Sequence, residues 1–208
     1  MEEVLDVYHR AYDPAKPLIC FDELCKQIVK EVQAPLAMKS GEIEKYDYHY
    51  ERNGVANLFM ISEPLKGKRC IKVTERRTKI DWAYVMKDIA DLHYSEADKI
   101  IIVMDNLNTH KASSFYEAFS PNEARRLINR FEFHYTPKHG SWLNMAEIEL
   151  SVLSRQCLDR RIPDIDSLKR EVKSWESSRN GKEGKICWQF TTAEARIKLK
   201  KLYPLIQV

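Results

Sequence analysis

An uninterrupted apolar run that ends in an acid lies in the middle of the chain. Residues 99–110 read Lys-Ile-Ile-Ile-Val-Met-Asp-Asn-Leu-Asn-Thr-His, so five consecutive apolar residues lead directly into Asp105. Apolar runs of this length that are rich in β-branched side chains are typical of a strand buried on both faces. An acid that ends such a strand lies at the carboxyl edge of the sheet, where open α/β sheets bind their ligands. The run therefore predicts an α/β fold with a functional site at Asp105.

Shorter patterned segments on both sides of this strand predict the rest of the sheet. Residues 18–22, 57–63 and 70–75 precede the central run and have the alternation or apolar content of strands, and residues 131–135 follow it as another. Residues 165–175 carry an apolar stripe at helical spacing. Strands at the front followed by alternating strands and helices predict an α/β layer fold, with helices on the faces of a mixed sheet and a helical C-terminal tail.

Composition places the chain among folded proteins without a membrane segment. Of its 208 residues 44% are apolar, and 34 basic against 31 acidic side chains leave a formal net charge of +3. A charge this small does not by itself argue for nucleic-acid binding. The five cysteines contain no Cys-x-x-Cys pair, which favours free thiols in a reducing cytosol. No apolar run approaches the roughly 18 residues of a membrane span, so we expect a cytoplasmic protein that does not contact a membrane.

Two further acids have settings comparable to that of Asp105. Asp22 closes the apolar run 18–22, and Glu147 lies on a helix that we expect over residues 141–158. Three carboxylates brought together repel one another unless a cation neutralises them, and hard divalent ions prefer oxygen ligands. Two such ions stabilise the charge that develops when a phosphodiester is cleaved or transferred. We therefore interpret the three acids as a candidate metal site.

Periodicity alone does not fix the third acid. On a helix with about 100° per residue, Glu147 and Glu149 flank the apolar stripe on opposite sides. Asn144, Glu147 and Ser151 form one polar row, which favours Glu147 slightly. For both glutamates an ordinary solvated helix flank is the alternative, and an acid at a strand end is commonly a turn former or a helix cap. The pattern leaves these alternatives open.

Several longer blocks of the sequence have a combined pattern that points to one family. They are residues 18–23, 103–110, 134–147, 153–162 and 190–196. Together they resemble the catalytic domain of DDE-superfamily transposases, and specifically the mariner-like bacterial insertion-sequence branch (insertion-sequence-630 type). The similarity extends over nearly the whole chain, and the second and third blocks are its most specific parts.

The resemblance implies a ribonuclease H-like fold, in which helices flank a mixed five-stranded sheet. By motif position, it implies that Asp22, Asp105 and Glu147 are the catalytic residues and the ligands of two Mg²⁺ or Mn²⁺ ions. It further implies metal-dependent DNA cleavage at transposon ends, followed by strand transfer into target DNA. The implied partners are DNA, both the terminal inverted repeats and the target, and a second copy of the chain in a homodimer on DNA. The implied location is the bacterial cytoplasm, in association with the nucleoid.

Other polar residues near the three acids are candidates for supporting roles or for contacts with DNA. In this interpretation they orient the ligands or contact phosphates. In the alternative they satisfy loop backbone groups or belong to an ordinary solvated face. These candidates are Asn106, His110, Lys138, His139, Asn144 and Arg155.

The blocks also suggest how the chain is organised. We expect residues 1–160 to form the catalytic domain and residues 161–208 to form a helical C-terminal extension packed on it. We expect no N-terminal helix-turn-helix of the kind that reads inverted repeats in this family. Leu24 and Cys25 stand where relatives often carry a basic residue. A catalytically inactive or accessory DNA-binding remnant of a transposase is therefore the alternative function.

Overall fold

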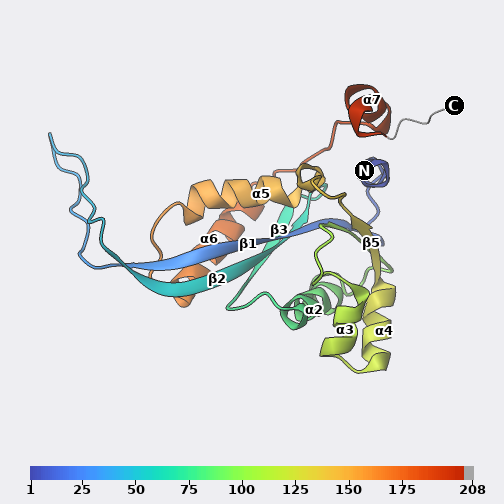
Figure 1. Cartoon of the computed structure of the whole chain (residues 1–208), viewed down its shortest axis with the longest axis horizontal. Helices are drawn as coiled ribbons and strands as arrows, with labels where there is room; N and C mark the ends of the chain where they lie inside the picture. Colours follow the sequence, from blue (N-terminus) through green and yellow to red (C-terminus); the bar gives the residue numbers. More distant parts are fainter. Residues whose placement is uncertain (204–208) are drawn as a thin grey trace.

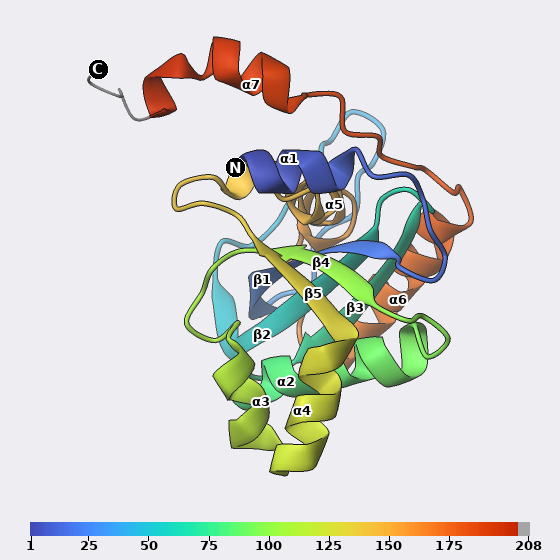
Figure 2. The same cartoon turned by 90° about the vertical axis from the view of Figure 1, so that its right-hand side faces the viewer.

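The computed structural model describes residues 1–203, and within them one mixed sheet has the strand order β3-β2-β1-β4-β5. The strands are β1 (Leu18–Glu31), β2 (Tyr50–Glu63), β3 (Lys68–Thr74), β4 (Ile100–Met104) and β5 (Phe131–Tyr135). β2 runs antiparallel to β1 and to β3, whereas β4 runs parallel to β1 and to β5 (Figure 2). The expected mixed five-stranded sheet is confirmed.

Helices cover both faces of this sheet (Figures 1 and 2). The α-helices are α1 (Glu2–Tyr8), α2 (Lys79–Asp88), α3 (Ala112–Ala118), α4 (Pro121–Arg130), α5 (Ala146–Leu153), α6 (Ile165–Asn180) and α7 (Thr192–Lys198). Shorter turns of 3₁₀-helix or π-helix are η1 (Ile89–His93), η2 (Ser141–Leu143), η3 (Ser154–Leu158) and η4 (Lys200–Leu202). Among residues 1–203, none of these helices combines the length and the apolar character needed to cross a membrane.

Alternate residues of β4 enter two separate cores. Ile101 and Val103 pack in the cluster that contains α5 and α6 residues, whereas Ile100, Ile102 and Met104 pack in the cluster that contains α2, α3 and α4 residues. Successive side chains of a strand point to opposite faces, so a strand covered on both faces must be apolar at every position. This double burial accounts for the apolar run that leads to Asp105.

The segments at both ends of the described chain contribute to the core on the α5 side. α1 buries Val4 and Leu5 there, and α6 buries Leu168, Val172 and Trp175 in the same cluster. α6 also packs along β3. The first residues of the C-terminal part are thus integrated with the sheet, and the division of the chain at residue 160 stays a prediction.

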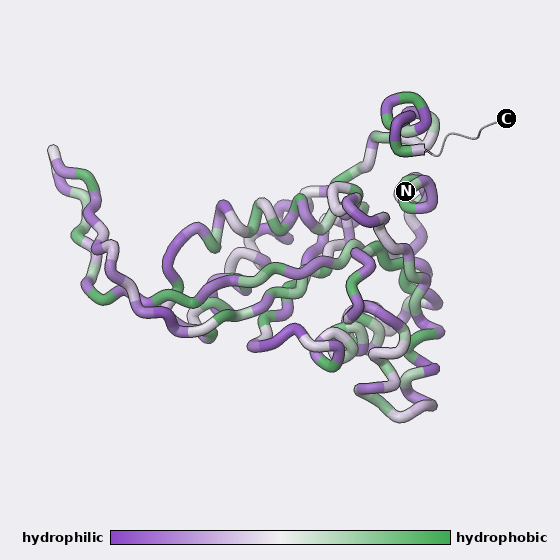
Figure 3. The backbone as a smooth tube through the Cα atoms, in the orientation of Figure 1, coloured by the Kyte–Doolittle hydropathy of each residue, from purple (hydrophilic) through white to green (hydrophobic). Residues whose placement is uncertain are grey.

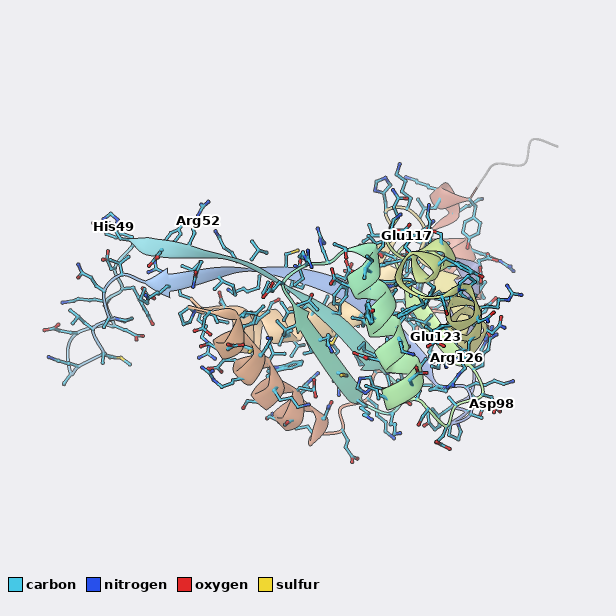
Figure 4. All side chains as sticks on the ribbon, turned by 90° about the horizontal axis from the view of Figure 1, so that it is seen from below. His49, Arg52, Asp98, Glu117, Glu123 and Arg126 are labelled. Carbon is cyan, nitrogen blue, oxygen red and sulfur yellow. The ribbon has the colours of Figure 1, made fainter. Side chains whose placement is uncertain are left out.

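β1 and β2 continue beyond the body of the sheet as a projecting hairpin (Figure 1). The sequence predicts a first strand at residues 18–22 and leaves open whether residues 26–32 extend it or begin a partner strand; β1 continues through them to Glu31. β2 is exposed at residues 50–55 and buried at residues 56–63. His49 and Arg52 lie toward the outer end, far from Glu123 and Arg126 at the opposite end of the molecule (Figure 4). Hydrophilic and hydrophobic residues are mixed along this projection (Figure 3), so no continuous apolar run in the sequence predicts it.

A buried ion pair joins α5 to β3. Nη2 of Arg69 lies 2.7 Å from Oε1 of Glu149, and both side chains are 0% exposed. Arg179 on α6 contacts the same carboxylate at 3.1 Å. The side chain of Asn180 accepts from the backbone N–H of Arg69 and donates to its carbonyl, both at 2.8 Å. These contacts fix the rotation of α5 about its axis, because Glu149 must face β3.

Removing the carboxylate of this pair should destabilise the fold strongly. Glu149→Ala leaves the Arg69 guanidinium buried without its partner, a change that typically costs about 3–5 kcal/mol. We expect that loss in the free energy of unfolding, measured by urea denaturation. The matched control is Glu171→Ala, which removes the exposed pair with Arg160 and should cost no more than about 1 kcal/mol. Equal losses in the two variants would contradict the role of the buried pair.

The same carboxylate should make stability depend on pH. Burial would raise the pKa of Glu149, but hydrogen bonds from Arg69 and Arg179 outweigh it and lower the pKa. A carboxyl group whose pKa is lower in the folded state stabilises the fold above its unfolded pKa and loses this contribution as pH falls through the folded pKa. We expect the free energy of unfolding to fall from about pH 5 downward, with a smaller slope in Glu149→Gln. Identical slopes would count against this assignment.

Candidate active site

The parallel pairing of β1 with β4 brings two of the predicted acids together. Cys20 lies opposite Val103 in this pairing, and the same register continued by two residues sets Asp22 beside Asp105. Neighbouring strands are about 4.8 Å apart. Cys20 and Val103 belong to the core on the α5 side, and residues two positions further along point to the same face. Asp22 therefore lies within β1, beside the residue that follows the end of β4, and the alternation of both strands directs the two positions to the face that α5 covers.

The segment that carries the third acid is not the single helix that we expected over residues 141–158. The turn η2 ends at Leu143, and Asn144 has an extended conformation with ψ of 110°. α5 begins only at Ala146, and from Ser154 the helix continues as the π-turn η3. The break has a local cause, because Oδ1 of Asn144 accepts the backbone N–H of Ala146 at 3.1 Å and so competes with a continuous helix.

This break aims the Asn144 side chain at β1. Its Nδ2 donates to the carbonyl of Phe21 at 2.8 Å and to Oδ2 of Asp22 at 3.3 Å, and the residue is 1% exposed. The carbonyl of Asn144 accepts the backbone N–H of Glu147 at 3.1 Å. Asn144 thus connects the first acid to the helical turn that carries the third.

The two glutamates that periodicity left open have different surroundings. Glu149 is fully buried in its ion pair with Arg69. Glu147 is only partly buried and acts electrostatically on Asp22. Burial raises the pKa of Asp22 to about 6, and the negative charges of Asp105 and Glu147 add to this shift, although a hydrogen bond from the Glu23 backbone N–H opposes it. The geometry therefore favours Glu147 as the third member of the acid group.

His110 lies beneath the two aspartates, on the opposite face of the sheet. Its Nδ1 is 2.6 Å from Oδ1 of Asp105, and its Nε2 is 2.8 Å from Oε1 of Glu23. The ring is 1% exposed and stacks on Trp82 with ring centroids 5.6 Å apart. Burial alone would lower the pKa of His110, but contacts with Asp105 and Glu23 raise it to about 9.

The other predicted residues lie farther from the acids or on exposed loops. Asn106 follows Asp105 directly and is exposed, and Lys138 and His139 are exposed in the loop after β5. Arg155, on η3, is exposed and lines a groove with Leu24. The structure thus gathers Asn144 and His110 around the acids, and it leaves Asn106, Lys138, His139 and Arg155 at the solvent-facing margin.

Glu23 is the residue at this site that the sequence interpretation missed. It directly follows Asp22, and its side chain is 5% exposed because it contacts His110. An available signal was the alternation of β1, which places neighbours on opposite faces. An acid that directly follows Asp22 in the same strand points to the other core, and a buried carboxylate needs a partner there.

The chemistry of the acid group fits a divalent cation, although the ligands are not already assembled around one point. Among residues 1–203, no group of three or more His, Cys, Asp or Glu side chains is placed to hold an ion. The donors are nevertheless carboxylate oxygens, which Mg²⁺ and Mn²⁺ prefer. Oδ1 of Asp105 is buried and, despite its short contact with His110, has no well-directed hydrogen bond. A cation would satisfy this oxygen and reduce the repulsion that raises the pKa of Asp22.

Solved structures of a transposase share this architecture. The Mos1 strand transfer complex matches with a TM-score of 0.60 and 13% sequence identity, over 88% of this chain and 54% of that chain. The Mos1 paired-end complex with left transposon end matches with a TM-score of 0.59 and 12% identity, over 88% of this chain and 55% of that chain. The Mos1 mariner paired-end complex with Mn matches with a TM-score of 0.55 and 12% identity, over 88% of this chain and 56% of that chain. The expected ribonuclease H-like fold is confirmed. The chain spans little more than half the length of these structures.

Sequence comparison identifies the family. No curated protein matches the chain. The family described as DDE superfamily endonuclease matches residues 17–169, a range that begins just before β1 and ends within α6. This range contains Asp22, Asp105, Asn144 and both glutamates of α5. The chain therefore belongs to the DDE superfamily endonuclease family.

Proposed function

We propose that the chain is the catalytic domain of a transposase that cleaves DNA at transposon ends and transfers the strand into target DNA. The observation that carries this proposal is the register of β1 and β4, which sets Asp22 beside Asp105 on the face where α5 presents Glu147. Membership of the endonuclease family supports DNA as the substrate. The structural relatives, which are transposase complexes with transposon ends and, in one case, Mn, support the remainder.

In this proposal Asp22, Asp105 and Glu147 hold two Mg²⁺ or Mn²⁺ ions. Such ions supply Lewis-acid stabilisation of the phosphate and lower the pKa of a bound water or hydroxyl group. Asn144 holds the Asp22 carboxylate through its hydrogen bond. Glu147 is partly exposed in the first turn of α5, so its side chain retains the rotameric freedom to complete the ligand set.

The remaining candidates serve binding and orientation. Asn106 and His110 orient the acid group from the loop after β4. Lys138 and His139, on the loop after β5, contact phosphates. Arg155 does so along the groove that starts two residues beyond Asp22. The cation of Lys26 in this groove donates to the carbonyls of Leu158 and Arg160 at 2.6 and 3.0 Å, which leaves Arg155 as the more available phosphate ligand.

The finer features of this proposal follow the family resemblance. We place the chain in the mariner-like bacterial insertion-sequence branch and propose that it binds terminal inverted repeats and target DNA as a homodimer. The alternative is an inactive or accessory DNA-binding remnant. One observation favours that alternative: Leu24 and Cys25 stand where relatives often carry a basic residue.

Substitution of the acids separates these two functions. We expect Asp105→Asn and Glu147→Gln each to reduce Mn²⁺-dependent nicking of supercoiled plasmid DNA at least about 100-fold, because several kcal/mol of transition-state stabilisation would be lost. Glu171→Gln, on the exposed face of α6, is the control and should nick normally. Nicking that persists in both acid variants would contradict the catalytic assignment. Absence of nicking in the unsubstituted chain would favour the remnant.

Arg155 should contribute one phosphate contact. We expect Arg155→Ala to weaken duplex binding and to reduce the slope of log K against log salt concentration by about 1, measured by fluorescence anisotropy over a series of salt concentrations. Arg125→Ala is the matched control, because Arg125 is exposed on α4, which precedes β5 and lies away from the acid group. A slope that changes equally in both variants would exclude a specific contact along the groove.

A further inference from the structure

Glu23 is a buried carboxylate for which the proposed chemistry has no direct use. It occupies β1 between the acid Asp22 and Leu24, and its alternation places it on the face opposite Asp22. Its pairing partner across the sheet is Phe59, which packs in the core on the α2 side. A carboxylate in such a core is costly unless it is paired, and His110 is the partner that the fold provides.

The ring of His110 is held from several directions. Trp82 stacks on it at 28° between the ring planes, and Phe21 contacts it edge-on, each with centroids 5.6 Å away. The hydroxyl of Tyr135 donates to the carbonyl of His110 at 2.9 Å. Within this enclosure the two ring nitrogens point in fixed directions, toward Glu23 on β1 and toward Asp105 after β4. The imidazole is therefore a rigid bridge between two carboxylates.

This bridge determines where the carboxylate of Asp105 lies. Asp105 follows the last residue of β4, and its side chain is 31% exposed, so its own strand restrains it little. Contact with Nδ1 of His110 at 2.6 Å supplies the missing restraint. The position of that nitrogen is set in turn by the 2.8 Å contact between Nε2 and Glu23. Substitution of Glu23 would therefore shift the His110 ring and, with it, the carboxylate of Asp105.

We propose that Glu23 is a positioning residue of the metal site, which acts through His110 to hold the Asp105 carboxylate beside Asp22. The inference rests on the proposed function, because it assigns the ion site to those aspartates. Glu23 is not itself a ligand in this arrangement. Its Oε1 contacts His110, its Oε2 lies 3.9 Å from Arg77, and its side chain is on the far face of β1 from Asp22.

A residue with this role differs measurably from one that only stabilises the fold. Loss of a group that orients a metal ligand typically weakens metal binding 10–100-fold, whereas loss of a purely structural carboxylate lowers the melting temperature and leaves metal affinity unchanged. Glu63 is the matched control. It is 2% exposed, lies on the same face of the sheet as Phe59, and accepts a hydrogen bond from the hydroxyl of Tyr94 at 3.0 Å, at the end of β2 away from the acids.

The test is Mn²⁺ binding by the 208-residue chain, followed by electron paramagnetic resonance of the free ion, with thermal unfolding measured in parallel. We expect Glu23→Ala to bind Mn²⁺ about 10–100-fold more weakly, and Glu23→Gln, which keeps an oxygen acceptor for His110, to lose less. Glu63→Ala should bind as tightly as the unsubstituted chain even where its melting temperature falls. If Glu23→Ala does not fold, Glu23→Gln carries the test, because it preserves the shape of the side chain.

Asp105→Asn distinguishes failure of this inference from failure of the proposed function. If the unsubstituted chain binds no Mn²⁺, or if Asp105→Asn binds it equally well, the metal site itself is wrong and the inference falls with it. If Asp105→Asn abolishes binding while Glu23→Ala and Glu23→Gln bind as tightly as the unsubstituted chain, the site stands and the positioning role of Glu23 is overturned. Weakening in Glu63→Ala equal to that in Glu23→Ala would likewise overturn it.

Discussion

The parallel pairing of β1 with β4 is the constraint on which the candidate site depends. It aligns two strands from distant parts of the chain so that Asp22, within β1, lies beside Asp105, which follows the end of β4. A shift of this register by one residue would send one aspartate to the opposite face. The register is well specified because β4 is buried on both faces, and a slip would move Ile102 and Val103 into the wrong cores.

A second constraint sets the orientation of α5. Its two glutamates face in different directions, and only Glu149 forms an ion pair with the buried Arg69. Because Glu149 pairs with Arg69 on β3, helix geometry directs Glu147 toward Asp22, whose pKa its negative charge raises. An ion pair remote from the chemistry therefore determines which glutamate the site receives. This use of a buried pair is one of specificity, since such pairs contribute little net stability compared with apolar packing.

The sequence was most informative where burial is simple. The run 100–104 is apolar on both faces, so its strand and its terminal acid were predicted correctly. The outer half of β1 was left open between an extension and a separate strand, because it projects from the body and carries exposed polar residues. The break at Asn144 was invisible because Leu143 and Ala146 keep the apolar spacing across it. Periodicity could not separate Glu147 from Glu149, because the partner that buries Glu149 is Arg69, far away in the chain.

The acids of the site lie on two faces of the sheet, with Asp22 on the α5 side and Glu23 on the α2 side. Burial raises the pKa of Asp22, and the negative charges of Asp105 and Glu147 raise it further. Beneath them His110 contacts one of these acids and Glu23 together. The fold thus restrains Asp105 through His110 and Asp22 through Asn144, and in the function proposed above the groove beside Arg155 receives DNA.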